Sequence, residues 1–116
     1  MTKHHPFSCG LEAALAVIGA KWKPLILYHL AQHTTLRYGE LRRAVGAVTH
    51  KVLIQQLKEL EADGIVKRVD HGEIPPRVDY SLTRFGQSLA QALAPLCQWG
   101  TDHLREVERV AARRAG

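Results

Sequence analysis

The chain has 116 residues, 46% of them hydrophobic, so it can bury one modest core and is too short for a two-domain enzyme. Its 16 Lys and Arg against 11 Asp and Glu give a formal net charge of +5, a mild preference for polyanions that many other domains share. No run of about 18 apolar residues is present to cross a membrane, and residues 1–10 lack the apolar centre of a signal peptide. We therefore expect a single cytoplasmic domain over 1–116, with no membrane partner.

Two helices are predicted in the first third of the chain from apolar residues at helical spacing. The first spans 11–18 and ends at Gly19. The second spans 22–32, with Pro24 tolerated in its first turn. The residues of the second helix that we expect to face the core are Trp22, Leu25, Ile26 and Leu30.

A helix-turn-helix follows. A short helix is predicted over 38–45, a glycine-containing turn over 46–48, and a longer helix over 50–63. Thr49 is a good N-cap for the longer helix, and Gly64 is a good residue to end it.

The longer helix has one apolar face and one polar face. Three leucines fall within an arc of about 60° at 100° per residue and form the predicted core face: Leu53, Leu57 and Leu60. The opposite face and the exposed N-terminal end contain the candidate DNA-reading residues: Thr49, His50, Lys51, Gln55 and Lys58. Lys neutralises phosphate or reaches guanine, and Gln pairs with adenine. Many ordinary surface helices have such a face, so this helix alone leaves DNA binding open.

After Gly64 the apolar period changes from helical to alternating. Two strands are predicted over 65–69 and 77–83, with Pro75 and Pro76 just before the second. In the second strand we expect one side to carry Val78, Tyr80 and Leu82 and the other Arg77, Asp79 and Ser81. A hairpin over about 65–83 directly after a helix-turn-helix predicts a mainly α fold with a small β-hairpin wing (α+β), a winged helix-turn-helix.

Basic residues flank the longer helix where phosphate contacts are expected. They lie on the short helix and the hairpin: Arg42, Arg43, Lys67, Arg68 and Arg77. Their combination with the polar helix face favours double-stranded DNA as the partner.

The C-terminal part of the chain predicts a long helix over about 84–112. Thr83 is its candidate N-cap, and Pro95 is expected to kink or split it. Apolar residues and a glycine recur at spacings of three and four and exceed what one small domain covers: Leu89, Leu93, Leu96, Gly100, Leu104 and Val107. Pairing with a second copy would bury them, and two recognition helices would then meet major grooves about 34 Å apart.

Three stretches resemble one family. They are AKWKPLILYHL at 20–30, LRYGELRRAVGAVTHKVLIQQLKELEADGIVKR at 36–68, and EIPPRVDYSLTRFG at 73–86. Together they closely resemble the HxlR-type winged helix-turn-helix transcriptional regulators of bacteria, which are related in fold to MarR proteins. The resemblance covers residues 9 to about 100 and implies a homodimeric DNA-binding regulator whose terminal helices form the dimer interface. The interface residues then also include Leu11, Leu15, Cys97 and Trp99.

The chain has two cysteines, Cys9 and Cys97, which are thiols by default in the cytosol. Cys9 lies beside the first helix, whose positive N-terminal end would lower its thiol pKa. The resemblance places it where some members have a cysteine that senses electrophiles or oxidants, although Gly10 stands where proline usually follows. The alternative is an unreactive thiol. Cys97 is expected in the core or the dimer interface, and a disulfide from Cys9 to Cys97 of a second copy is a hypothesis.

A metal site and an enzyme are the remaining classes to weigh. His29 and His33 are four residues apart, and His4 and His5 could add ligands, but no acidic or cysteine partner has matching spacing. We expect no metal and no cofactor. The chain has no glycine-rich phosphate loop or nucleophile elbow, so we do not expect an enzyme. The rival to a DNA-binding regulator is a winged-helix module that contacts protein or RNA and has no operator.

Overall fold

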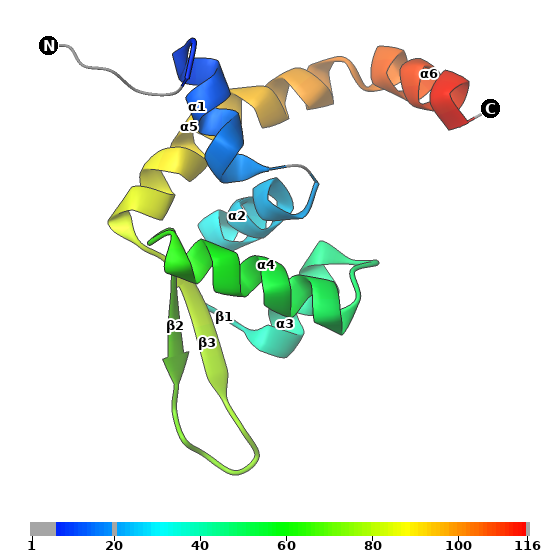
Figure 1. The fold of residues 1–116 in the computed structure, drawn as a ribbon. Helices are drawn as coiled ribbons and strands as arrows, with labels where there is room; N and C mark the ends of the chain where they lie inside the picture. The colour runs from blue at the N-terminus through cyan, green and yellow to red at the C-terminus, as the bar shows by residue number, and fades with distance from the viewer. Residues whose placement is uncertain (1–6, 20, 116) are drawn as a thin grey trace, which may run out of the picture.

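The computed structural model describes residues 7–19 and 21–115. Figure 1 shows a helical body with the β-hairpin projecting at one end and α1, α5 and α6 at the other. The elements in chain order are α1 Gly10–Ile18, α2 Trp22–Gln32, β1 Leu36–Arg37, α3 Tyr38–Val45, α4 His50–Ala62, β2 Val66–Asp70, β3 Val78–Leu82, α5 Arg84–Asp102 and α6 Leu104–Ala115. This order confirms the predicted winged helix-turn-helix.

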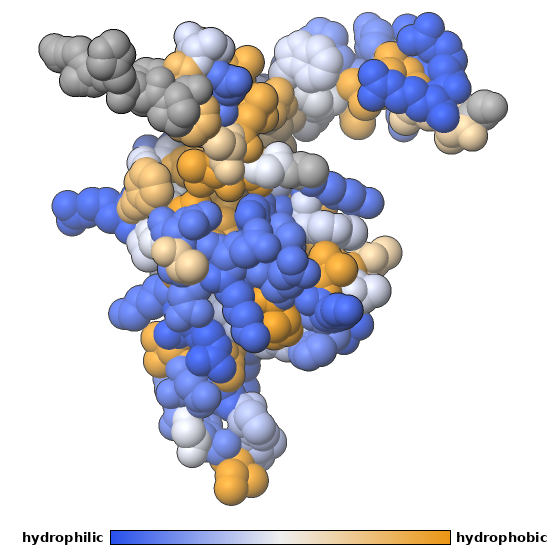
Figure 2. Space-filling model, viewed as in Figure 1, coloured by the Kyte–Doolittle hydropathy of each residue, from blue (hydrophilic) through white to orange (hydrophobic). Residues whose placement is uncertain are grey.

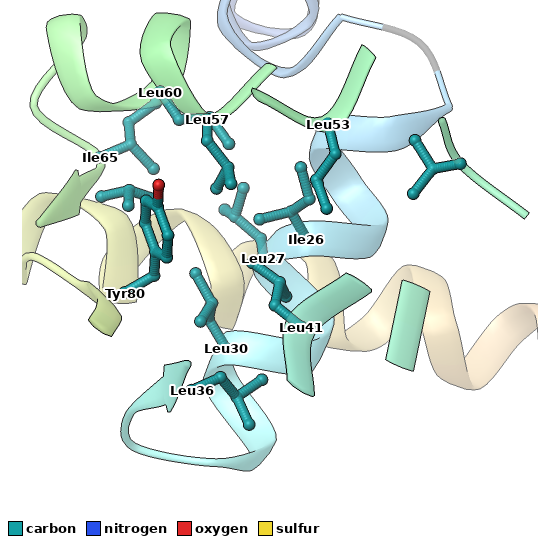
Figure 3. Packing of buried hydrophobic residues seen from close by; sticks show 12 residues of the cluster. Ile26, Leu27, Leu30, Leu36, Leu41, Leu53, Leu57, Leu60, Ile65 and Tyr80 are labelled. Atoms are coloured by element: carbon teal, nitrogen blue, oxygen red, sulfur yellow. The ribbon is translucent and has the colours of Figure 1, made fainter. Parts of the chain in front are cut away.

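Helix α2 is the centre of the core. Its buried residues are Ile26, Leu27 and Leu30, and they face the leucine side of α4 (Figure 3). The predicted core face of α4 is confirmed, because Leu53, Leu57 and Leu60 are at most 1% exposed. On α2, Leu27 is a core residue that the sequence pattern did not pick out, whereas Trp22 and Leu25 are only half-buried.

The helix-turn-helix has the predicted caps. Gly46 ends α3 with a φ of 99°, a conformation that side chains with a Cβ rarely adopt. Val48 is buried in the turn, and the Val52 amide donates to the Thr49 hydroxyl oxygen at 3.2 Å. Helix α4 ends at Ala62, one residue before the predicted end, and Gly64 follows with a φ of 74°. Both ends of α4 are therefore set by local residues.

The sheet differs from the predicted two-stranded hairpin. Within the described residues, a third strand β1 joins it, and the antiparallel order is β1–β3–β2. Leu36 lies opposite Tyr80, and Arg37 lies opposite Asp79. Two residues are too few to show an alternating pattern, so the strand is apparent only from its pairing with β3 in the structure.

Asp79 shares one side of its strand with Arg77, as predicted, and the two side chains are in contact, but the sequence did not predict its burial. Only 9% of Asp79 is exposed. Because β1 pairs with β3 at this position, Asp79 belongs to the central strand of the sheet, with Arg37 on one side and Val69 on the other. The alternation of side chains shows which residues share one side of a strand. It does not show that the strand has a paired neighbour at both of its edges.

The predicted long C-terminal helix is two helices, and the break is not at the proline. Helix α5 continues through Pro95, whose missing amide costs little because Pro95 and Gln91 are exposed to solvent. The break is at His103, where the backbone leaves helical geometry and the ring stacks on Trp99 with 4.7 Å between centroids. None of the described helices combines the length and the apolar character needed to cross a membrane.

The carbonyl group of Ile65 is the meeting point of three elements: the end of α4, the start of β2 and the start of α5. The Thr83 amide donates to this oxygen at 3.0 Å, and the Thr83 hydroxyl lies 2.6 Å from the Gly64 oxygen and 3.1 Å from the Ile65 oxygen. The Gly86 amide donates back to the Thr83 hydroxyl at 3.0 Å, which caps α5. We call this group of residues the Ile65 junction.

Gly86→Ala should destabilise the fold, because a Cβ at this position would lie 2.1 Å from the Ile65 carbonyl oxygen. The backbone must shift to relieve such a contact, at a cost of about 2 kcal/mol or more. Thermal unfolding at one fixed protein concentration measures the loss.

Gly39→Ala is the matched control, because it is also a helical glycine and its added Cβ would meet only the Arg43 side chain, at 3.6 Å. It should stabilise the protein by about 0.5 to 1 kcal/mol through helix propensity. Equal effects of the two substitutions would contradict the steric explanation.

Candidate nucleic-acid interface

Helix α4 presents its polar face to solvent. Lys51, Gln55 and Lys58 are exposed, and Figure 2 shows mostly hydrophilic side chains on the face of the molecule over α4. Their exposure follows from the burial of the leucine side of the same helix, since residues three and four apart share a face. The outward side chains are the donor types that meet phosphates and base edges in DNA.

The C-terminal half of α4 is held by an ion pair. The Lys23 ammonium of α2 lies 2.6 Å from the Glu59 carboxylate, and this contact keeps the pKa of Glu59 below its ordinary value. The Gln55 amide also donates to Glu59 at 3.4 Å. Gln55 is thus one of the candidate DNA-reading residues with an intramolecular partner, and DNA would have to compete for its amide.

The N-terminal end of α4 contains a residue that the sequence analysis missed. The hydroxyl of Tyr38, the first residue of α3, contacts Nδ1 of His50, the first residue of α4. The two rings meet edge to face, with centroids 5.3 Å apart and planes at 82°. The two residues are 12 positions apart across a turn, so no helical or strand period links them.

An open cleft of about 380 Å³ lies between α3, α4 and the wing, which we define as β2, the connection 71–77 and β3. Four arginines line it: Arg37, Arg43, Arg68 and Arg77. The structure thus brings one candidate from α3 together with two from the wing, and it adds Arg37, which the sequence analysis did not select. Its position just before α3 was the available signal. Arg42 and Lys67 are exposed but do not line this cleft.

Arg77 is held by the buried carboxylate of the wing. Its Nη2 lies 3.2 Å from Asp79 Oδ2, and Nε2 of His71 lies 2.9 Å from the same oxygen. Hydrogen bonding from Arg77, and then from His71, keeps the pKa of Asp79 below its ordinary value despite its partial desolvation. The His71 amide donates to the Arg77 carbonyl at 3.0 Å, which closes the connection. His71 thus both helps to hold the Asp79 carboxylate and closes the connection of the wing.

Most of the predicted dimer residues lie on an exposed apolar surface of α1, α5 and α6. The exposed fractions are 68% for Leu11, 63% for Leu96 and 55% for Leu104. Leu15, Cys97, Trp99 and Val107 are also exposed, whereas Gly100 is half-buried and Leu93 packs partly against the core. Figure 2 shows apolar residues gathered over α1 and the adjoining part of α5.

The two cysteines are free thiols and both are exposed. Cys9 is the N-cap residue of α1, where the amides of Glu12 and Leu11 favour the thiolate and hold the pKa of Cys9 below its ordinary value. The predicted direction of this shift is confirmed. Cys97 lies on α5 but not in the core, so one of the two expected environments is wrong.

The two histidines of the weighed metal pair do not share one helix, because His29 lies on α2 and His33 is the residue after its end. Nδ1 of His33 lies 3.1 Å from the His29 carbonyl oxygen, and burial lowers the pKa of His29. Over residues 7–19 and 21–115, no three His, Cys, Asp or Glu side chains converge as metal ligands. His4 and His5 lie outside the described residues.

A family model described as HxlR-like helix-turn-helix matches residues 17–108. The chain belongs to the HxlR-like family. It is 46% identical over 101 residues to the HTH-type transcriptional regulator YtcD of Bacillus subtilis, covering 87% of this chain and 79% of YtcD.

Solved structures agree with this assignment. The redox regulator HypR in its reduced form is similar with a TM-score of 0.79 and 40% identity, over 87% of this chain and 99% of HypR. A MarR-family regulator from Porphyromonas gingivalis W83 is similar with a TM-score of 0.77 and 32% identity, over 86% of this chain and 97% of that one. This HxlR-like chain is thus a transcriptional regulator with a helix-turn-helix DNA-binding domain, as the sequence resemblance implied.

Proposed function

We propose that this HxlR-like chain binds a palindromic or pseudo-palindromic operator as a homodimer, with α4 in the major groove. The observation that carries the proposal is the orientation of α4, whose leucine side is buried while Lys51 and Gln55 face solvent. Thr49 and His50 stand at the N-terminal end, the end that recognition helices direct at base edges.

In this proposal, the basic residues around α4 bind the phosphates of the DNA backbone. Arg43 comes from α3, and Arg68 and Arg77 from the wing, so they border α4 on the side of the open cleft. Asp79 holds Arg77 with its Nη2 at 3.2 Å, which orders the arginine before DNA arrives and lowers the entropy lost on binding. Arg42, Lys58 and Lys67 are exposed and would add further phosphate contacts in this proposal.

Lys51→Ala and Gln55→Ala should each weaken binding to an operator by about 1 to 3 kcal/mol if both side chains read bases. Arg43→Ala should instead weaken binding to all DNA sequences and reduce the salt dependence by about 0.9 in slope, because one phosphate contact is lost. Fluorescence anisotropy with a selected duplex and a scrambled duplex, at several salt concentrations, separates the two effects.

Gln91→Ala is the control for Gln55→Ala, because Gln91 is an exposed glutamine on α5. It should leave both affinities unchanged. A wild-type chain with no salt-sensitive preference for any duplex would overturn the proposed function and favour a protein-contact or RNA-binding module.

The second copy in the proposed dimer covers the apolar surface of α1, α5 and α6. An apolar groove of about 460 Å³ between α2 and α5 continues this surface and is lined in part by Leu25, Tyr28, Leu96 and Cys97. Large exposed apolar patches of this kind mark interaction sites. A stable interface buries about 800 Å² per partner, and burial of side chains such as Leu96 and Leu104 would contribute to it.

Leu96→Glu combined with Leu104→Glu should convert the dimer to a monomer, because two carboxylates would be buried without partners. Sedimentation equilibrium measures the mass. Arg109→Glu is the control, since Arg109 lies on α6 about 140° around the helix from Leu104. It should leave the mass unchanged. A wild-type chain of monomer mass at micromolar concentration would overturn the dimer.

We also propose that Cys9 makes the regulator responsive to oxidants or electrophiles. Three observations support this role: its exposure, its lowered thiol pKa at the start of α1, and the similarity to HypR, which is named as a redox regulator. Cys97 of the second copy is the proposed partner, and forming the disulfide removes two electrons and two protons from the two thiols.

Diamide, which accepts those electrons and protons, should convert the wild-type chain to a band of twice its mass on non-reducing electrophoresis. Cys9→Ser and Cys97→Ser should each abolish the band, and dithiothreitol should reverse it. Absence of the band in the wild type would overturn the pairing. A band that persists in Cys97→Ser would assign the bond to two Cys9 residues instead.

A further inference from the structure

Tyr38 and His50 form a pair at the start of the proposed recognition helix. One residue begins α3 and the other begins α4, so the pair connects the two helices of the motif across the turn. The Tyr38 hydroxyl contacts His50 Nδ1, and the edge-to-face packing at 5.3 Å limits rotation of the imidazole ring. His50 is exposed, whereas Tyr38 is half-buried and packs against the core.

The contact engages Nδ1 of His50, so Nε2 is the ring nitrogen that is left to meet DNA. The Tyr38 hydroxyl keeps its proton at neutral pH, since burial raises the pKa of Tyr38. A tyrosine hydroxyl can donate or accept; in the neutral tautomer of His50 in which the hydroxyl donates to Nδ1, the imidazole proton is on Nε2. With protonated His50, Nδ1 donates to the Tyr38 oxygen, and Nε2 again has a hydrogen. Nε2 is therefore a donor in the Nε2–H tautomer and in protonated His50, and these are the two forms that the proposal uses.

We propose that Tyr38 positions His50 so that its Nε2–H donates to an acceptor on the major-groove edge of the operator, which makes the Tyr38–His50 pair a determinant of sequence recognition. This inference rests on the proposed function. Guanine N7 and O6 and adenine N7 are the acceptors that such a donor reaches from a helix N-terminus. Tyr38 is a positioning residue, because its own hydroxyl is used by His50.

The anchoring of α4 supports this role. The Thr49 hydroxyl accepts from the Val52 amide at 3.2 Å, and the Leu53 amide donates to the Thr49 carbonyl at 2.9 Å. The backbone beside His50 is therefore fixed, and its side chain is fixed by Tyr38. A donor that is held before binding loses less entropy on contact with DNA than a freely rotating side chain.

The test is a double-mutant cycle of Tyr38→Phe and His50→Ala, read by fluorescence anisotropy. The probes are a duplex of about 30 base pairs selected by the wild-type chain from random DNA, and a scrambled duplex of the same composition. Tyr38→Phe keeps the ring and should bind the selected duplex about 5-fold more weakly, the fold-change expected from one lost hydrogen bond. Its binding to the scrambled duplex and its thermal unfolding midpoint should be unchanged.

In the His50→Ala background, Tyr38→Phe should have no further effect, because Tyr38 acts through His50. His33→Ala is the control for His50→Ala, since His33 is also an exposed histidine whose Nδ1 contacts an oxygen of the chain, the His29 carbonyl at 3.1 Å. It should change neither affinity.

Three outcomes would overturn the inference while leaving the proposed function intact. They are an unchanged affinity of Tyr38→Phe for the selected duplex, an equal loss on both duplexes, and the same 5-fold loss in the His50→Ala background. Replacing the guanines and adenines of the selected duplex by their 7-deaza forms should also abolish the difference between wild type and Tyr38→Phe if N7 is the acceptor. A wild-type chain that selects no sequence overturns both the inference and the proposed function.

Discussion

The carbonyl group of Ile65 is the point on which the arrangement of this molecule depends. Ile65 lies between α4 and β2, the first strand of the wing. Its carbonyl oxygen accepts a hydrogen bond from the amide of Thr83, the N-cap residue of α5. A Cβ on Gly86 would lie 2.1 Å from its oxygen, so α5 can approach only because this residue is glycine. One peptide group thus connects the proposed recognition helix, the wing and the helix that holds much of the proposed dimer surface.

This connection matters because a symmetric regulator recognises DNA only when its recognition helices and wings have the right distances and angles between them. The rotation of α4 about its axis is set by its buried leucines, and the position of the wing relative to α4 is set at the Ile65 junction. The start of α5 therefore contacts the start of the wing and the end of α4 directly through backbone groups. In the proposed dimer, the same contact would relate the spacing of the two recognition helices to the way the two copies pack.

The helix-turn-helix was predictable because its signals are local. Thr49 and Gly64 act on their own helix ends, and the leucines of α4 repeat at a spacing that any single helix shows. The third strand was missed because its pairing joins residues that are distant in the chain, Leu36 with Tyr80 and Arg37 with Asp79. The end of α5 was missed for another reason, because Pro95 was the stronger breaking signal in the sequence, whereas His103 bonds to and stacks on Trp99 in the preceding turn.

In the candidate site, too, the sequence predicted what depends on neighbours in the chain and missed contacts between distant residues. The sequence selected the polar face of α4 from its period, and it selected basic residues of α3 and the wing from their positions beside that helix. It did not select Arg37, which shares the cleft with Arg77, or Tyr38, which contacts His50 across the turn. Residues separated by 12 or by 40 positions show no common period.

The sequence by itself determined the class of this protein. The helix-turn-helix and the hairpin after it, the caps of α4, the outward side of that helix and the resemblance to HxlR-type regulators all follow from residue type and spacing. The tertiary structure alone decided which polar side chains have partners: Asp79 with Arg77 and His71, Glu59 with Lys23, and His50 with Tyr38. The physical reason is that backbone conformation and amphipathic faces depend on neighbours in the chain, whereas hydrogen bonds and ion pairs depend on which elements packing brings together.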